Sequence, residues 1–168
     1  MSQLLACYVD GRPTEVIPIY DRGLQYGDGV FTTVAVKAGV PLLWDRHLRR
    51  LQADAARLSI VLPAAELLQD DVGRVCANVA SATLKIMLTR GSTGRGYRVS
   101  TAAPTRRILS LWQRAPQPQP ATDGVMLRLC RTRLSRNPAL AGIKHLNRLE
   151  QVLARAEWGD DYAEGLMQ

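Results

Sequence analysis

Apolar and polar residues alternate along several short stretches of the chain, which is the pattern of half-buried β-strands. The clearest stretch is residues 30–37, where β-branched residues alternate before a predicted turn at Ala38–Gly39 and the apolar residues 40–44. We therefore expect a β-hairpin there. The other predicted strands are residues 4–9, 83–91, 106–113, 125–134 and 161–168.

Two segments space their apolar residues at three and four positions instead, which predicts amphipathic helices. Residues 45–60 have Asp45 as a plausible N-cap, and residues 63–80 open with Pro63, which suits the first turn of a helix. Helices set among antiparallel strands indicate an α+β fold. The predicted apolar face of the first helix consists of Leu48, Leu51, Ala55 and Leu58.

A third helix is predicted within residues 142–155, and a single lysine, Lys144, stands at its entrance. A lysine kept from water can act as a nucleophile toward a carbonyl or as a general base. Most single lysines are surface residues, so this position alone does not decide between the two interpretations. The apolar stripe of the predicted helix is Leu146, Leu149, Val152 and Leu153.

Prolines recur within residues 115–124, which predicts an extended, stiff connector that cannot lie inside a sheet. We expect residues 1–114 to form a small N-terminal α+β domain and residues 115–123 to be an interdomain linker. Residues 124–168 are then the first part of a larger domain, because so short a segment cannot bury a good core alone.

Composition narrows the classes of function. The chain has 168 residues, of which 46% are hydrophobic and 22% are charged, as in a globular protein. No apolar run approaches the roughly 18–20 residues that span a membrane, and the N-terminal pattern is not that of a signal peptide. We expect a cytoplasmic protein without a membrane partner.

The net charge of +7 comes from basic residues that are spread through the chain. The chain contains no long basic run and has one phenylalanine, so an anion pocket is a better interpretation than nucleic-acid binding. Three widely spaced cysteines, Cys7, Cys76 and Cys130, predict neither a disulfide framework nor a zinc site. His47 and His145 are interpreted as solvated or packed helix residues, because no ligand spacing connects them to other candidate ligands.

The stretch RGSTGRGY at residues 90–97 combines three glycines with Arg90, Arg95 and Tyr97. Its backbone can approach a ligand closely, and its guanidinium groups suit a carboxylate or a phosphate. The pattern is neither a P-loop nor a dinucleotide-binding fingerprint. A flexible basic hairpin explains the same residues equally well.

The Gly-Asp-Gly triplet at residues 27–29 predicts a sharp turn. This turn places Phe31, Thr32 and Thr33 at one end of the sheet. Most such triplets are ordinary turns, so the signal is weak by itself.

The order of four motifs is more informative: YGDGVF, HLRRL, RGSTGRGY and NPALAGIKHLNRLEQVLAR. In this order they resemble the fold-type IV pyridoxal-phosphate enzymes, and the chain is most similar to the 4-amino-4-deoxychorismate lyase family among them. The resemblance runs over nearly the whole chain, and residues 137–155 are its most specific part. The first two motifs are shared with D-amino-acid and branched-chain aminotransferases.

The resemblance implies roles for individual residues. Lys144 matches the lysine that binds the cofactor, pyridoxal 5'-phosphate, and moves protons. Arg50 in HLRRL matches the arginine that binds the cofactor phosphate. Arg95 and Tyr97 match positions that hold the substrate carboxylate in D-amino-acid aminotransferases. Phe31 matches a tyrosine there, and the missing hydroxyl argues against transamination of ordinary amino acids.

Arg90 and Thr32 complete the expected substrate pocket. A cluster of Arg50, Arg90 and Arg95 would hold both the cofactor phosphate and a dicarboxylate substrate. Thr32 and Thr33 are candidate hydroxyl groups in the same pocket.

The implied reaction converts 4-amino-4-deoxychorismate to 4-aminobenzoate and pyruvate in folate biosynthesis, in a homodimer. The resemblance places the carboxylate that pairs with the cofactor's pyridine nitrogen beyond residue 168. We therefore expect the chain as given to be a truncated lyase that is inactive or weak. Two alternatives stay open: a fold-type IV aminotransferase for D-amino or branched-chain amino acids, and a non-catalytic basic fragment.

Overall fold

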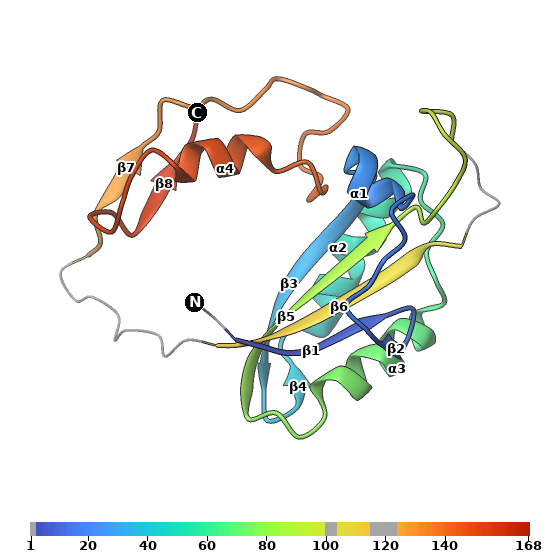
Figure 1. Ribbon diagram of the computed structural model, residues 1–168. Helices are drawn as coiled ribbons and strands as arrows, with labels where there is room; N and C mark the ends of the chain where they lie inside the picture. Colours follow the sequence, from blue (N-terminus) through green and yellow to red (C-terminus); the bar gives the residue numbers. More distant parts are fainter. Residues whose placement is uncertain (1–2, 100–103, 115–123) are drawn as a thin grey trace. The chain divides into compact units, whose positions relative to one another are not determined.

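The computed structural model describes residues 3–99, 104–114 and 124–168 (Figure 1). The chain divides into two compact units. The first contains the N-terminal residues up to Ala115 together with Ile143–Leu146, and the second contains Pro116–Gly142 and Asn147–Gln168. The predicted linker, residues 115–123, lies outside the described residues, so the domain boundary stays a prediction.

The first unit is built on a six-stranded sheet with the order β2-β1-β6-β5-β3-β4 (Figure 1). Every pair of neighbouring strands in it is antiparallel. The longest pairing joins β3 to β5, from Gly29 opposite Thr89 to Lys37 opposite Ser81. The strands are β1 (Leu4–Val9), β2 (Arg12–Pro13), β3 (Gly29–Lys37), β4 (Val40–Pro41), β5 (Ser81–Thr89) and β6 (Arg106–Gln113).

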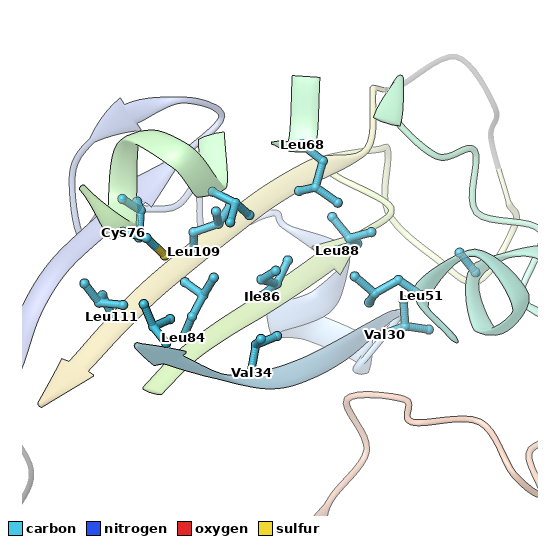
Figure 2. Packing of buried hydrophobic residues seen from close by; sticks show 14 of the residues in the cluster. Val30, Val34, Leu51, Leu68, Cys76, Leu84, Ile86, Leu88, Leu109 and Leu111 are labelled. Atoms are coloured by element: carbon cyan, nitrogen blue, oxygen red, sulfur yellow. The ribbon is translucent and has the colours of Figure 1, made fainter. Parts of the chain in front are cut away.

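Three helices belong to this unit: α1 (Arg22–Tyr26), α2 (Trp44–Arg57) and α3 (Ala65–Cys76). Alternate side chains of the central strands point to one face, where they pack with residues of α2 and α3 (Figure 2). This face is the core of the unit. The fully buried core residues include Val30, Val34, Leu51, Leu84, Ile86, Leu88 and Leu109.

None of the described helices is long and apolar enough to cross a membrane.

The predicted hairpin is confirmed, because β3 turns through Ala38 and Gly39 into β4. Both turn residues have positive φ angles, 50° and 77°. The prediction for the next helix was wrong in one detail. The N-cap of α2 is Leu43, and Asp45 lies within the first turn, where a negative charge still favours the helix N-terminus. The sequence patterns did not predict the short elements α1 and β2.

The second unit contains β7 (Leu127–Leu129) and β8 (Glu164–Leu166), which pair in parallel, and α4 (Leu149–Arg155). The strand predicted at 125–134 is therefore shorter than expected. Beyond Cys130, the backbone N–H groups of Arg131 and Thr132 donate to the carboxylate of Glu157 instead of continuing a ladder. These backbone hydrogen bonds lower the pKa of Glu157 to about 2.

The three cysteines are packed to different extents. Cys76 and Cys130 are buried and Cys7 is half-buried, and all three are free thiols. Burial raises the pKa of Cys76 to about 11, which makes this thiol a weak nucleophile at neutral pH.

Candidate active site

The segment Ile143–Leu146 pairs with the first residues of β3, where His145 lies opposite Val30. The N–H of Phe31 donates to the carbonyl of Lys144 at 2.9 Å, and the N–H of Leu146 donates to the carbonyl of Gly29 at 3.0 Å. The predicted helix entrance at Lys144 was therefore wrong: α4 begins only at Leu149. Lys144 lies before the helix, and its carbonyl pairs with the backbone of β3.

Gly29 permits this close approach of the two segments. A Cβ atom at this position would lie 2.5 Å from the carbonyl oxygen of Leu88 and 2.6 Å from Cδ1 of Leu146. A larger residue would clash with the backbone of β5 and with the end of the Leu146 side chain, so the local packing would have to shift. The second glycine of the Gly-Asp-Gly triplet thus has a packing function besides its place in the turn.

Lys144 is anchored from a second side by α2. Its backbone N–H donates to Oδ2 of Asp54 at 3.1 Å, and Asp54 is only 5% exposed. Its Nζ lies 4.5 Å from the centre of the Phe31 ring, and Nζ of Lys85 lies 5.2 Å from the centre of the same ring. The backbone of Lys144 is therefore fixed by two elements, and its amine lies against an aromatic side chain.

Replacing Asp54 by alanine is expected to lower the free energy of unfolding by about 1–3 kcal/mol, because the Lys144 N–H loses its acceptor in a buried place. Asp54→Asn keeps an acceptor oxygen and should lose less. Urea unfolding followed by tryptophan fluorescence measures both. Gln52→Ala, on an exposed position of the same helix, is the control, and equal stability of Asp54→Ala and Gln52→Ala would contradict the prediction.

A second group of side chains surrounds Arg50. Its Nη2 donates to Oγ1 of Thr32, and the same hydroxyl lies 2.8 Å from Nδ1 of His47. Thr32 is fully buried on β3, whereas Arg50 is exposed on α2. Burial first, and the charge of Arg50 second, lower the pKa of His47 below its ordinary value. The salt bridges found in the described residues do not include Arg50, so its charge is available to an anion.

Arg90 has a different environment from the one expected of a substrate ligand. It is 6% exposed, its Nε and Nη2 donate to the carboxylate of Asp28, and its Nη1 and Nη2 donate to the carbonyls of Ser59 and Leu58. Arg22 donates to the same carboxylate at 2.8 Å. These contacts give Arg90 a structural role, and its contact with the substrate stays a prediction.

The other two residues of the glycine-rich loop are at the surface. Arg95 is exposed, and Tyr97 is 84% exposed with its ring 5.4 Å from that of Tyr26 in an edge-to-face arrangement. Arg22 holds the loop by donating to the carbonyl of Gly96 at 2.8 Å. The role of Arg95 and Tyr97 as carboxylate ligands stays a prediction.

The sequence patterns did not single out His47 and Asp54 as site residues. They are separated from Arg50 by three and four positions, and residues at this spacing lie on the same face of a helix. The interpretation of His47 as an ordinary helix residue missed this signal. A polar row at positions 47, 50 and 54 on a helix whose other faces are apolar or solvated indicates a shared environment.

Residues 29–167 match the family described as amino-transferase class IV. The match covers most of the chain, and the protein belongs to this family. It begins at Gly29 on β3 and includes the Arg50 group, Asp54 and Lys144.

Two named relatives are similar to this chain. The aminodeoxychorismate lyase of Vibrio harveyi is 38% identical over 161 residues, which is 95% of this chain and 59% of the relative. A D-alanine aminotransferase of Listeria monocytogenes is 31% identical over 114 residues, which is 66% of this chain and 39% of the relative. The chain thus matches less than two thirds of the length of each.

Solved structures agree with the fold. The crystal structure of 4-amino-4-deoxychorismate lyase from Pseudomonas aeruginosa is 49% identical with a TM-score of 0.86, over 96% of this chain and 60% of that one. The branched-chain aminotransferase of Escherichia coli, at 20% identity, has a TM-score of 0.78 over 98% of this chain and 60% of that one. The predicted fold, that of a fold-type IV pyridoxal-phosphate enzyme, is confirmed for the part present here.

Proposed function

We propose that this chain provides the reactive lysine and the phosphate-binding arginine of a pyridoxal-phosphate-dependent lyase. Its substrate is 4-amino-4-deoxychorismate, and its products are 4-aminobenzoate and pyruvate. The observation that carries the proposal is the position of Lys144, fixed at the edge of β3 by Phe31 and Asp54. The two lyases described above, at 38% and 49% identity, support the choice of reaction.

The described residues fit the cofactor. Lys144 offers a primary amine for a carbonyl. Arg50 offers a phosphate dianion a guanidinium group that is paired with no carboxylate among the described residues. The two cations contact consecutive residues of one strand, Phe31 and Thr32. When bound, pyridoxal phosphate supplies an electron sink for the negative charge that develops on the substrate.

Lys144 has two tasks in this proposal. Its amine would hold the cofactor in the absence of substrate. With substrate bound, the same amine would remove the proton from the carbon that bears the substrate nitrogen and deliver a proton to the departing enolpyruvate, which leaves as pyruvate while the substrate ring becomes aromatic. The Phe31 ring, 4.5 Å from Nζ, stabilises the protonated amine through its π-face and keeps water from one side of it.

Arg95 and Tyr97 are proposed to bind the carboxylates of the substrate. Both are exposed on the glycine-rich loop, where a ligand can reach them. Phe31 supplies no hydroxyl at the position where the related aminotransferases carry a tyrosine. This difference supports a pocket that is not built for the carboxylate of an ordinary amino acid.

Borohydride trapping tests the role of Lys144 sharply, because lysine occurs at only three positions of the sequence, 37, 85 and 144. The protein is incubated with pyridoxal phosphate, reduced and digested, and the labelled peptide is identified by mass spectrometry. We expect the label on Lys144. Label distributed equally over the three lysines would overturn the proposal and favour a non-catalytic basic protein.

The second candidate function is an aminotransferase, which the likeness to the Listeria D-alanine aminotransferase favours. The two reactions differ in their need for an acceptor. A lyase releases pyruvate from 4-amino-4-deoxychorismate without any keto acid, whereas an aminotransferase requires one. Pyruvate release coupled to lactate dehydrogenase, with and without 2-oxoglutarate, separates them.

We also propose a cytoplasmic homodimer, on the resemblance to the family. Sedimentation equilibrium of the full-length protein tests the dimer. A single species at the monomer mass over a wide range of concentrations would contradict it.

A further inference from the structure

The contacts among Thr32, His47 and Arg50 determine the positions of the protons. A guanidinium group has only donors, so Oγ1 of Thr32 accepts from Nη2 of Arg50. Oγ1 keeps a second lone pair, so a donor hydroxyl and a donor Nδ1–H both suit its 2.8 Å contact with Nδ1 of His47. We assign the hydroxyl as the donor, which makes His47 the neutral tautomer that carries its hydrogen on Nε2.

The charge of Arg50 favours the same assignment. Nδ1 of His47 lies 3.4 Å from Nη2 of Arg50, so a proton on Nδ1 would bring two positive charges together. Burial and this arginine both lower the pKa of His47. Among the described residues, α2 supplies the charge that acts on the ring, and β3 supplies the uncharged hydroxyl of Thr32.

The neutrality of these partners distinguishes Arg50 from the buried arginines. Arg22 and Arg90 donate to the carboxylate of Asp28, which cancels charge as well as fixing geometry. Thr32 and His47 fix the position of Arg50 without cancelling its charge. The hydrogen bonds that the structure shows for Arg50 use Nη2 alone, so Nε and Nη1 are left for an outside anion.

We propose that Thr32 and His47 are positioning residues that hold the Arg50 guanidinium for the phosphate of the cofactor. The proposal rests on the proposed function and refines it. In this arrangement the buried hydroxyl fixes Nη2, the neutral imidazole fixes the hydroxyl, and the opposite side of the guanidinium binds the phosphate. Thr32 then acts through Arg50 and does not contact the substrate.

The test compares two forms of the cofactor on the full-length protein. Thr32→Val and His47→Phe should each bind pyridoxal phosphate about five- to tenfold more weakly, the effect of one lost hydrogen bond of ordinary strength. Binding of pyridoxal, which has no phosphate, should be unchanged. Thr32→Ser keeps the hydroxyl and should restore the affinity, and Arg49→Met, an exposed neighbour on the same helix, is the control.

Arg50→Met separates failure of the refinement from failure of the proposed function. If Arg50→Met binds pyridoxal phosphate as tightly as the wild type, the phosphate role of Arg50 itself is wrong. If Arg50→Met binds weakly but Thr32→Val and His47→Phe bind normally, only the positioning proposal is overturned. An equal loss of affinity for pyridoxal and its phosphate in Thr32→Val also overturns it, because that result indicates general damage to the fold.

Nitrogen-15 NMR of His47 provides a readout that does not depend on the cofactor. The expected spectrum is that of a neutral ring protonated on Nε2. In Arg50→Met the pKa of His47 should rise toward its ordinary value, because the neighbouring positive charge is gone. A ring protonated on Nδ1, or a pKa that does not respond to Arg50→Met, would overturn the proposal.

Discussion

Replacing Lys144 by alanine is expected to lower kcat/KM for pyruvate release from 4-amino-4-deoxychorismate by at least about 10³-fold. On the proposed function, the variant loses the amine that holds the cofactor and, with it, the base that moves the proton, a step that a positioned base accelerates by about 10²–10⁴. Because the backbone of Lys144, and not its side chain, makes the hydrogen bonds to Phe31 and Asp54, the fold should survive. The assay is coupled pyruvate detection with the full-length protein.

Two controls make this result specific. Lys37→Met removes an exposed amine at the far end of β3 and should leave turnover unchanged. Circular dichroism and the unfolding midpoint of Lys144→Ala should match those of the wild type. Retention of more than a tenth of the wild-type kcat/KM in Lys144→Ala would exclude this lysine as the base, whatever its position at the sheet edge.

The central strands and helices of the first unit could be predicted from the sequence because their signals are local. In β3, residues 30, 34 and 36 are buried and residues 33 and 37 are exposed, as the alternation indicated. The helix predicted at 45–60 is observed as Trp44–Arg57. The spacing of apolar residues shows which side of an element is buried. Both β3 and α2 bury their apolar side against the same face of the sheet, so the local spacing was enough to predict them.

The setting of Lys144 could not be predicted in the same way. The helical spacing of the apolar residues in α4 extends back to Leu146. Nothing in the local sequence shows that Ile143–Leu146 lie beside β3 instead of starting the helix. That pairing depends on contacts with Gly29 and Phe31, more than a hundred positions earlier in the sequence. Tertiary hydrogen bonds here override a local pattern.

The arginines show a similar limit. The sequence alone does not distinguish Arg50 from Arg90, because both lie in motifs that suit the binding of an anion. In the structure Arg90 is paired with Asp28, whereas Arg50 is held by the uncharged Thr32 and His47. Which arginine is available to a ligand depends on where the carboxylates of the fold lie, and this is settled by tertiary structure.

Removing the charge of Asp28 is expected to cause the largest loss of stability in the first unit. Its carboxylate accepts hydrogen bonds from Nε of Arg22 and Nε of Arg90, both at 2.8 Å. The two arginine side chains are only 4% and 7% exposed. Asp28→Asn leaves two buried positive charges without a counter-charge. We expect the free energy of unfolding to fall by roughly 3–5 kcal/mol, the cost of breaking a buried ion pair from one side.

The measurement is urea unfolding followed by fluorescence, with Asp70→Asn, an exposed aspartate on α3, as the matched control. The control should change the free energy of unfolding by less than about 0.5 kcal/mol. A loss in Asp28→Asn no larger than that of the control would show that the two arginines are solvated in solution and that the ion pairs contribute little.

The difference in the free energy of unfolding between wild type and Asp28→Asn should also depend on pH, which gives an independent check. Burial by itself would raise the pKa of Asp28, but the hydrogen bonds and charges of Arg90 and Arg22 outweigh it and lower the pKa below 3.8. The unfolded chain therefore binds a proton at higher pH than the folded chain does. The stabilisation by Asp28 is complete well above pH 3.8 and is lost as the pH falls through the lowered native pKa. The gap between wild type and Asp28→Asn should accordingly stay constant near neutral pH and shrink below pH 4, and a gap that widens on acidification would contradict the assignment.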